Sequence, residues 1–442
     1  MTDAGWVERG EHRRVWRMAG PIVVANMSVP LLGAVDTAVV GNLPDPVYLG
    51  GVALGAMLFM FIYQAFICLR MGMTGPTAQA RGAGDHAEVR GMLHSGLVLA
   101  GLIGLGLLVL QLPIAAIAFW LVDSTPEVEA YGRTYFHIRV WAIPAALATY
   151  VLIGWLYGLL DARTPLIIQF FANGINIVLD LLFVFGFGWD VAGVAAASVI
   201  AEYSGLALGV WFVMRRLRTL PAGGMQRRLF DGARLRRLVS INRDLFIRTM
   251  CVVGAFAIFI GQSAKLGELT LAANQVLHNF QQFTAFGLDG FAYAAEALVG
   301  GAYGQRNAGA FRSAVRASLL WAGIVALLFV AVYWLAGPSV VALLTGIPEV
   351  RAEAGSFLLW AVFMPAISVW AFTLDGIYVG VSRTRVMRNT MLLSFLAFVA
   401  GVYLLVPVMG NTGLWISVAV FLSARGLLLA FTYPNLLRSV QT

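Results

Sequence analysis

The stretch LLGAVDTAVVGNL, residues 31–43, contains a single carboxylate, Asp36, in a segment that is otherwise apolar back to about Pro21. Asn42 and Pro44 end the apolar run. Because about 20 helical residues cross the hydrocarbon core of a bilayer, residues 21–40 are long enough to form a membrane-spanning helix. An ionisable side chain inside such a helix is costly, so Asp36 is a candidate functional residue.

The composition places the whole chain in the same class. Of 442 residues, 60% are hydrophobic and 12% are charged, and the mean hydropathy is +0.81. These values exclude a set of soluble domains and indicate a polytopic membrane protein. The first twenty residues carry charges throughout, so we expect the first apolar segment to stay as a membrane helix rather than to be cleaved as a signal. Cys68 and Cys251 lie in apolar runs and predict neither a disulfide nor a metal site.

Twelve apolar runs are long enough to span a membrane. They fall near residues 21–40, 49–70, 92–121, 134–159, 165–187, 191–214, 245–263, 270–300, 313–336, 354–381, 387–408 and 412–436. The sequence therefore predicts an all-α polytopic membrane protein with 12 transmembrane helices in two pseudo-symmetric six-helix lobes. We expect the first lobe over residues 1–214, a basic cytoplasmic linker over 215–243 and the second lobe over 244–442.

The connectors between the apolar runs alternate in charge. Those on one side hold most of the arginines, whereas the opposite connectors hold only Arg133, Lys265 and Arg351. By the positive-inside rule the arginine-rich side is cytoplasmic, and an even number of spans places both termini there. The net charge of +8 is then explained by membrane orientation, and we expect no nucleic-acid partner.

The two halves resemble each other at a fixed offset of 220 residues. The matched positions are Gly41 and Gly261, Gly84 and Gly304, Arg163-Thr164 and Arg383-Thr384, and Gly193 and Gly413. Six spans in each half give the halves the same orientation, which is a common plan among transporters.

Two carboxylates are predicted at similar depth in the first lobe. Asp36 lies about five residues before the outer end of the first span, and Asp180 about seven residues before the outer end of the fifth. Asn173, Asn176 and Asp180 share one helix face by their spacing, and Ser198 in the sixth span adds a hydroxyl. Two acids in a low dielectric cannot easily keep both charges, so the group can accept a proton near neutral pH. The same oxygens could hold sodium; alternatively, Asn176 and Asp180 only hold helices together.

The second lobe differs, because a polar stripe follows most of its second span. The residues of the stripe are Gln275, His278, Asn279, Gln282, Asp289 and Glu296. The stripe could line a wet cavity that attracts cations, or it could be a seam between packed helices.

Other ionisable residues in the spans have a simpler interpretation. Asp375 lies near the cytoplasmic end of the tenth span and could be close to water, and Glu202 is near mid-depth. Arg139 and Arg425 could each neutralise an acid. We favour a structural role for these residues and keep Asp375 and Glu202 as secondary candidates.

Motifs of enzymes and of ATP-driven pumps are missing from the sequence. It contains no GxSxG, HExxH or phosphate-binding glycine loop, and its five histidines are scattered. A transporter with this sequence would be driven by an ion gradient, and we expect no cofactor.

Four segments together resemble the multidrug and toxic compound extrusion (MATE) family, with most similarity to its DinF branch. They are VPLLGAVDTAVVGNL (29–43), NGINIVLDLLFVFG (173–186), GVAAASVIAEY (193–203) and GFAYAAEALVGGAYG (290–304). The resemblance implies a monomeric exporter of cationic or amphipathic organic compounds in the bacterial cytoplasmic membrane, working by antiport with protons or sodium from a cleft between two lobes. It also implies that Asp36 is the coupling acid, that Asn176, Asp180 and Ser198 belong to the same site, and that Pro21 matches the bend of the first helix.

The sequence departs from the NorM branch of that family, where an acid on the seventh span joins one on the tenth. Here the segment TMCVVGAFAIFIGQ, residues 249–262, has no acid, so Asp375 lacks that partner. Coupling through Asp36 and Asp180 is therefore expected, with protons favoured over sodium. The alternatives are a lipid-linked precursor flippase of the same superfamily and, less favoured, a membrane-embedded enzyme or a channel.

Overall fold

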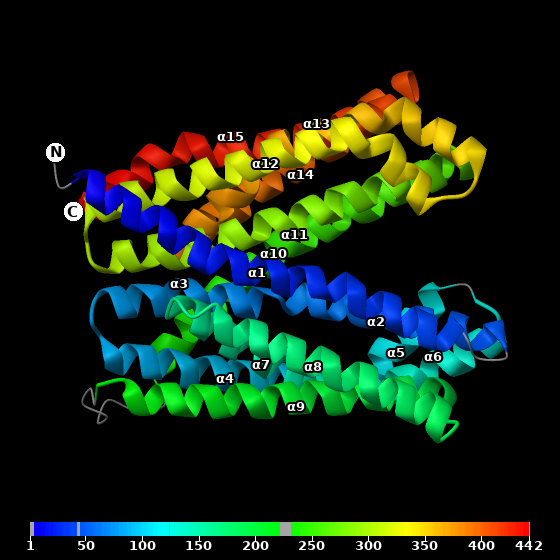
Figure 1. Ribbon diagram of the computed structural model, residues 1–442, viewed down its shortest axis with the longest axis horizontal. Helices are drawn as coiled ribbons and strands as arrows, with labels where there is room; N and C mark the ends of the chain where they lie inside the picture. The colour runs from blue at the N-terminus through cyan, green and yellow to red at the C-terminus, as the bar shows by residue number, and fades with distance from the viewer. Residues whose placement is uncertain (1–3, 42–44, 123, 222–230, 442) are drawn as a thin grey trace. The chain divides into compact units, whose positions relative to one another are not determined.

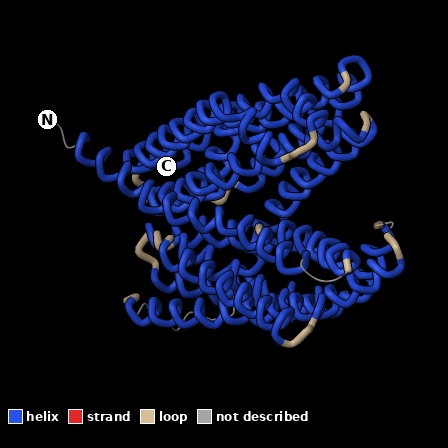
Figure 2. Tube along the Cα trace, turned by 45° about the vertical axis from the view of Figure 1, so that its right-hand side comes forward, coloured by secondary structure: helices blue, strands red, loops and turns tan. Residues whose placement is uncertain are grey.

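The structure is a computed structural model that describes residues 4–41, 45–122, 124–221 and 231–441, without the side chains of residues 4–9, 29, 31, 32, 34, 36, 37, 40 and 441. The described residues form helices joined by short loops, with no strand among them (Figure 2). This agrees with the all-α prediction.

The chain folds into two compact units. The amino-terminal unit comprises Val24–Ala80 and Asp85–Asn242, and the carboxy-terminal unit comprises Met1–Val23, Arg81–Gly84 and Arg243–Thr442. The first helix, α1 (Ala4–Gly41), contributes to both units, because its first part belongs to the carboxy-terminal unit.

Further helices of the amino-terminal unit correspond to the predicted spans two to six, several of which are built from two pieces. They are α2 (Pro46–Phe66), α3 (Cys68–Gly82), α4 (His86–Val109), α5 (Gln111–Leu121), α6 (Pro126–Arg139), η1 (Val140–Ala142), α7 (Ile143–Gly158), α8 (Arg163–Leu181), η2 (Leu182–Gly186) and α9 (Asp190–Thr219). In Figure 1, α8 lies beside α9 and α4 beside α7. A buried core that includes Phe59, Tyr135 and Trp155 fills this unit.

The carboxy-terminal unit is built from longer, unbroken helices. They are α10 (Gly232–Lys265), α11 (Glu268–Gly304), α12 (Ala308–Leu344), α13 (Pro348–Gly380), α14 (Thr384–Met409) and α15 (Asn411–Gln441). The part of α10 before Arg243 belongs to the amino-terminal unit. Phe280, Met391 and Phe398 belong to its separate core. Each unit therefore has its own apolar interior.

Ten helical segments of the described chain are long and apolar enough to cross a membrane. Two further helices, α1 with 38 residues and α11 with 37, are also longer than the roughly 20 residues that a crossing needs. Large apolar side chains point outward, as expected of helices in lipid: Leu335, Leu343 and Val408 are exposed. The fold is that of a multi-pass membrane protein.

Both ends of the predicted linker are helical, because α9 continues to Thr219 and α10 begins at Gly232. Two arginines hold these ends near α4. Arg90 donates hydrogen bonds to the carbonyl oxygens of Leu217 (2.9 Å) and Leu220 (3.0 Å). Arg234 donates to a carboxylate oxygen of Glu88 at 2.8 Å. Residues 222–230 of the predicted linker lie outside the described residues.

Helices α11 and α13 approach closely because α13 has glycines where they meet. A Cβ atom at Gly376 would stand 2.2 Å from the carbonyl oxygen of Ala292, and one at Gly380 would stand 2.5 Å from that of Glu296. Small residues at such positions allow van der Waals contact between helix backbones in membranes. The pair is therefore sensitive to added side-chain volume.

We expect Gly376→Ala to destabilise the protein by about 1–3 kcal/mol, because the methyl group forces a backbone shift in a packed interior. Gly323→Ala in α12 is the matched control, since nothing lies within 4 Å of a Cβ atom there. That change should be neutral or stabilising by up to about 1 kcal/mol, because alanine favours helix. Thermal unfolding of the purified variants measures both, and equal midpoints would contradict the prediction.

Candidate functional site

A row of buried polar side chains follows one face of α8. Asn173, Asn176 and Asp180 are 8%, 3% and 0% exposed, while Phe170 and Val178 on the same helix are exposed. Residues three and four apart lie on the same helix face, so the sequence spacing alone produces the row. The polar face of α8 is turned into the amino-terminal unit and the apolar face outward.

A hydrogen bond joins this row to α1. The Nδ2 atom of Asn173 donates to the hydroxyl oxygen of Ser28 at 3.1 Å, and both residues are buried. Gln169 in turn donates to the Oδ1 atom of Asn173 at 3.0 Å. The first and fifth spans thus touch in the amino-terminal unit.

The same contact fixes the level of Asp36. Helices α1 and α8 correspond to the first and fifth predicted spans, which run in the same direction. Asp36 follows Ser28 by eight residues and Asp180 follows Asn173 by seven, which corresponds to about 12 Å and about 10 Å along the two helices. The backbones of the two acids therefore lie at a similar level along the two helices. The side chain of Asp36 lies outside the described residues.

Helix α9 brings Ser198 to that level as well. A Cβ atom at Gly205 would stand 3.1 Å from the Cβ atom of Ala172 in α8, and one at Gly193 would stand 3.1 Å from the Cβ atom of Phe183 in η2, which directly follows α8. Between these two contacts the antiparallel register places Ser198, which is 4% exposed, level with Asp180.

Two polar atoms in this region have no hydrogen-bond partner among the described residues. They are the Nδ2 atom of Asn176 and the hydroxyl oxygen of Ser198. Buried polar groups are normally hydrogen-bonded, so these two atoms are candidates for a functional role. Asn176, Ser198 and the carboxylate of Asp180 are thus a group of polar side chains inside an apolar unit.

Helix α1 contains Pro21 and Pro30 and is helical through both. The boundary between the two compact units falls between Val23 and Val24, and hence between the prolines. Proline removes one backbone hydrogen bond of a helix and allows a kink. The bend at Pro21 that the family resemblance implies stays a prediction.

Glu202 and Arg139 lie together in the amino-terminal unit. The charge of Arg139 acts directly on Glu202, and the arginine also donates a hydrogen bond to the hydroxyl of Tyr135. Its guanidinium carbon lies 5.3 Å from the centre of the Phe59 ring. The arginine near Glu202 is therefore held among aromatic side chains.

The carboxy-terminal unit contains an ionic group in which Asp375 and Arg425, both singled out from the sequence, are joined by Arg248, which was not. Arg248 of α10 donates to the Oδ2 atom of Asp375 at 3.0 Å through Nε and again through Nη2, and Arg425 of α15 donates to the same oxygen. Asp289 of α11 interacts electrostatically with both arginines. We call Arg248, Asp289, Asp375 and Arg425 the ionic cluster.

The interpretation of Asp375 as close to water is wrong, because the residue is only 4% exposed. Three helices place it in the interior, where two arginines satisfy its charge. Arg248 was the overlooked residue. The sequence feature that could have identified Arg248 is its position in DLFIRTM, residues 244–250, near the start of the seventh predicted span.

The predicted polar stripe of α11 divides into an exposed and a buried part. Gln275, Asn279 and Gln282 are exposed, His278 and Asp289 are half-buried, and Glu296 is buried. His278 lies against Phe256, with ring centres 4.7 Å apart, and 3.2 Å from Gln282. Glu296 is therefore packed inside the unit, and a cavity wall formed by the exposed residues stays a prediction.

The described residues contain no group of three or more His, Cys, Asp or Glu side chains that could hold a metal ion. Buried polar groups within multi-pass helical units are instead typical of secondary transporters. The fold and the polar groups together therefore define a polytopic membrane transporter.

The chain belongs to the MatE family, whose family model matches residues 21–182 and 245–404. DNA damage-inducible protein F of Escherichia coli (strain K12) is 41% identical over 420 residues, which cover 95% of this chain and 91% of that protein. Probable multidrug resistance protein NorM of Idiomarina loihiensis is 25% identical over 445 residues, which cover 96% of this chain and 94% of that protein. The resemblance to the MATE family and its DinF branch is thus confirmed, and these homologues are transporters rather than enzymes.

A solved structure shares the fold. It is described as the outward-facing conformation of a multidrug resistance MATE family transporter of the MOP superfamily. Its TM-score is 0.88 at 18% sequence identity, and the match covers 100% of this chain and 99% of that chain. The helical architecture is therefore that of MATE transporters.

Proposed function

We propose that the protein exports cationic or amphipathic organic compounds by antiport with protons, and that Asp36, Asn176, Asp180 and Ser198 form the coupling site. The observation that carries this proposal is the buried α8 row, joined to α1 at Ser28 and level with Ser198 of α9. A carboxylate such as Asp180, 0% exposed, is costly inside a membrane unless it has a function or a partner.

Protons are favoured over sodium as the coupling ion. Two carboxylates at one depth in a low dielectric readily share a proton. Sodium would need several oxygen ligands held around it, and it remains the alternative at Asp36, Asn176 and Asp180. The carboxy-terminal unit does not favour a second cation site, because two arginines already satisfy Asp375.

Protonation of Asp36 would bias α1 between a bent and a straight form near Pro21. Because α1 contributes to both units, such a change would alternate access for the cargo. The exposed part of the α11 stripe, Gln275, Asn279 and Gln282, with His278 beside it, would line the wet path of a cationic compound.

The proposed membrane topology and location follow from the charge pattern of the connectors and from membership of the MatE family. We propose twelve crossings of the bacterial cytoplasmic membrane, with both termini in the cytoplasm. The protein would act as a monomer with lipid around it, as the family resemblance implies.

The test uses the purified protein in liposomes with ethidium, a cationic aromatic dye, as the probe. We expect a pH gradient that is acidic on the outer face to drive ethidium against its own gradient, because each proton that moves down a gradient of one pH unit releases about 1.4 kcal/mol. A sodium gradient at clamped pH should drive less than about a tenth of that rate.

Equal rates with sodium alone would contradict proton coupling. Ion flux at channel rates without the dye would contradict antiport itself. Empty liposomes and liposomes with equal pH on both sides are the controls.

A further inference from the structure

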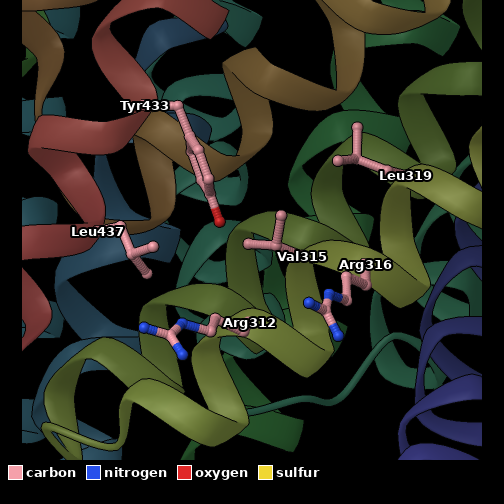
Figure 3. A pocket seen from close by; sticks show the side chains of 6 residues that line it. All are labelled: Arg312, Val315, Arg316, Leu319, Tyr433 and Leu437. Carbon is pink, nitrogen blue, oxygen red and sulfur yellow. The ribbon is translucent and has the colours of Figure 1, made fainter.

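A groove lies between the first turns of α12 and the last turns of α15, within the carboxy-terminal unit. Its volume is about 420 Å³. The lining residues are Arg312, Val315, Arg316 and Leu319 of α12, and Tyr433 and Leu437 of α15 (Figure 3). None of them belongs to the proposed coupling site or to the ionic cluster.

The mouth of the groove is positively charged. Arg312 and Arg316 are one turn apart on α12 and exposed, and within the described residues neither guanidinium has a carboxylate within 4.0 Å. The hydroxyl of Tyr433 points toward the two arginines from the facing helix (Figure 3), and both arginines act on it electrostatically. Three hydrogen-bond donors thus converge from two helices with no anion of the described chain among them.

The floor of the groove is apolar and continues into a lipid-facing row. Val315, Leu319 and Leu437 form the floor. At steps of four residues beyond Arg316, α12 carries Leu320, Ile324 and Leu328, which are exposed. Residues four apart follow one helix face. An occupant with an anionic head could therefore lay an apolar tail along α12.

The groove lies at the arginine-rich end of the helices, which is the predicted cytoplasmic side. Anionic lipids attract basic residues there, and basic pockets between helices bind phosphate head groups. Guanidinium groups match phosphate oxygens with paired hydrogen bonds, and tyrosine is typical of the membrane interface.

We propose that this groove binds the phosphate head group of an anionic membrane lipid, with an acyl chain along the Leu320–Leu328 row. The head group would accept hydrogen bonds from Arg312 and Arg316 of α12 and from Tyr433 of α15. Lipid would thereby bridge two helices at the edge of the unit. The site does not depend on which ion drives transport.

The test measures retention of phosphatidylglycerol on the full-length protein in detergent by native mass spectrometry. The double variant Arg312→Gln/Arg316→Gln should weaken binding at least tenfold. The matched control is Arg385→Gln/Arg438→Gln, which removes the same charge from two exposed arginines outside the groove and should stay within twofold. Arg312→Lys/Arg316→Lys keeps the charge but loses the guanidinium fork, and should weaken binding about threefold.

Three outcomes would overturn the proposal. One is an equal loss in the two glutamine variants, which would show general attraction to the basic surface. The second is unchanged lipid binding by the Arg312→Gln/Arg316→Gln variant, provided that the variant has the same elution volume and unfolding midpoint as the original protein. The third is displacement of the lipid by an equal concentration of inorganic phosphate, which would identify a free anion as the occupant.

Discussion

Asp180→Asn will reduce ethidium export driven by a pH gradient to the background of empty liposomes, a loss of at least about 100-fold. The amide has nearly the same size as the carboxylate but cannot take up a proton at any working pH. Asp180 is 0% exposed, and at its level α9 supplies Ser198. Without a group that is alternately charged and neutral, the gradient has no means of biasing the two states of the transporter. Asp36→Asn should have the same effect.

Asp190→Asn is the matched control for this prediction. Asp190 begins α9 in the same unit, is half-buried and carries the same charge. Export by that variant should stay within twofold of the original protein. The thermal unfolding midpoint and the binding of ethidium without a gradient separate lost coupling from lost folding. Export at the original rate by a folded Asp180→Asn protein would remove Asp180 from the coupling site.

The local features of the fold could be predicted because they depend on neighbours in sequence. Apolar runs of about 20 residues predict membrane helices, and helices occupy these runs. The three- and four-residue spacing of Asn173, Asn176 and Asp180 predicts one helix face, and all three side chains are buried. Helix periodicity alone is enough to predict that these side chains share one face.

The pairing of distant residues could not be predicted from one sequence. Arg248 and Asp375 are 127 residues apart, and Ser28 and Asn173 are 145 apart. Nothing in their local sequence states which helices touch. Both Arg248 and Ser28 are polar residues within spans, so the rule that singled out Asp36 would have flagged them as needing a partner. Their partners depend on helix packing.

Asp375→Asn should destabilise the protein by about 3–5 kcal/mol, because removing one partner of a buried ion pair leaves charge uncompensated. Arg425 is 3% exposed and Asp375 4%, and the same Asp375 oxygen accepts hydrogen bonds from Arg248 as well. The thermal unfolding midpoint should fall by roughly 3–5 °C. Glu349→Gln, an exposed acid in the first turn of the same helix, is the control and should cost less than about 1 kcal/mol.

The double variant Asp375→Asn/Arg425→Gln tests whether uncompensated charge causes the destabilisation by Asp375→Asn. It removes one buried positive charge together with the negative one, leaving Arg248 with Asp289, so it should be more stable than Asp375→Asn alone. Additive destabilisation would contradict an ionic cluster, since independent residues add and coupled ones do not. Export by Asp375→Asn, measured below its unfolding temperature, should keep its dependence on the pH gradient. A folded Asp375→Asn protein that binds ethidium but no longer responds to the gradient would instead make Asp375 a coupling acid, and the division of roles between the two units would be wrong.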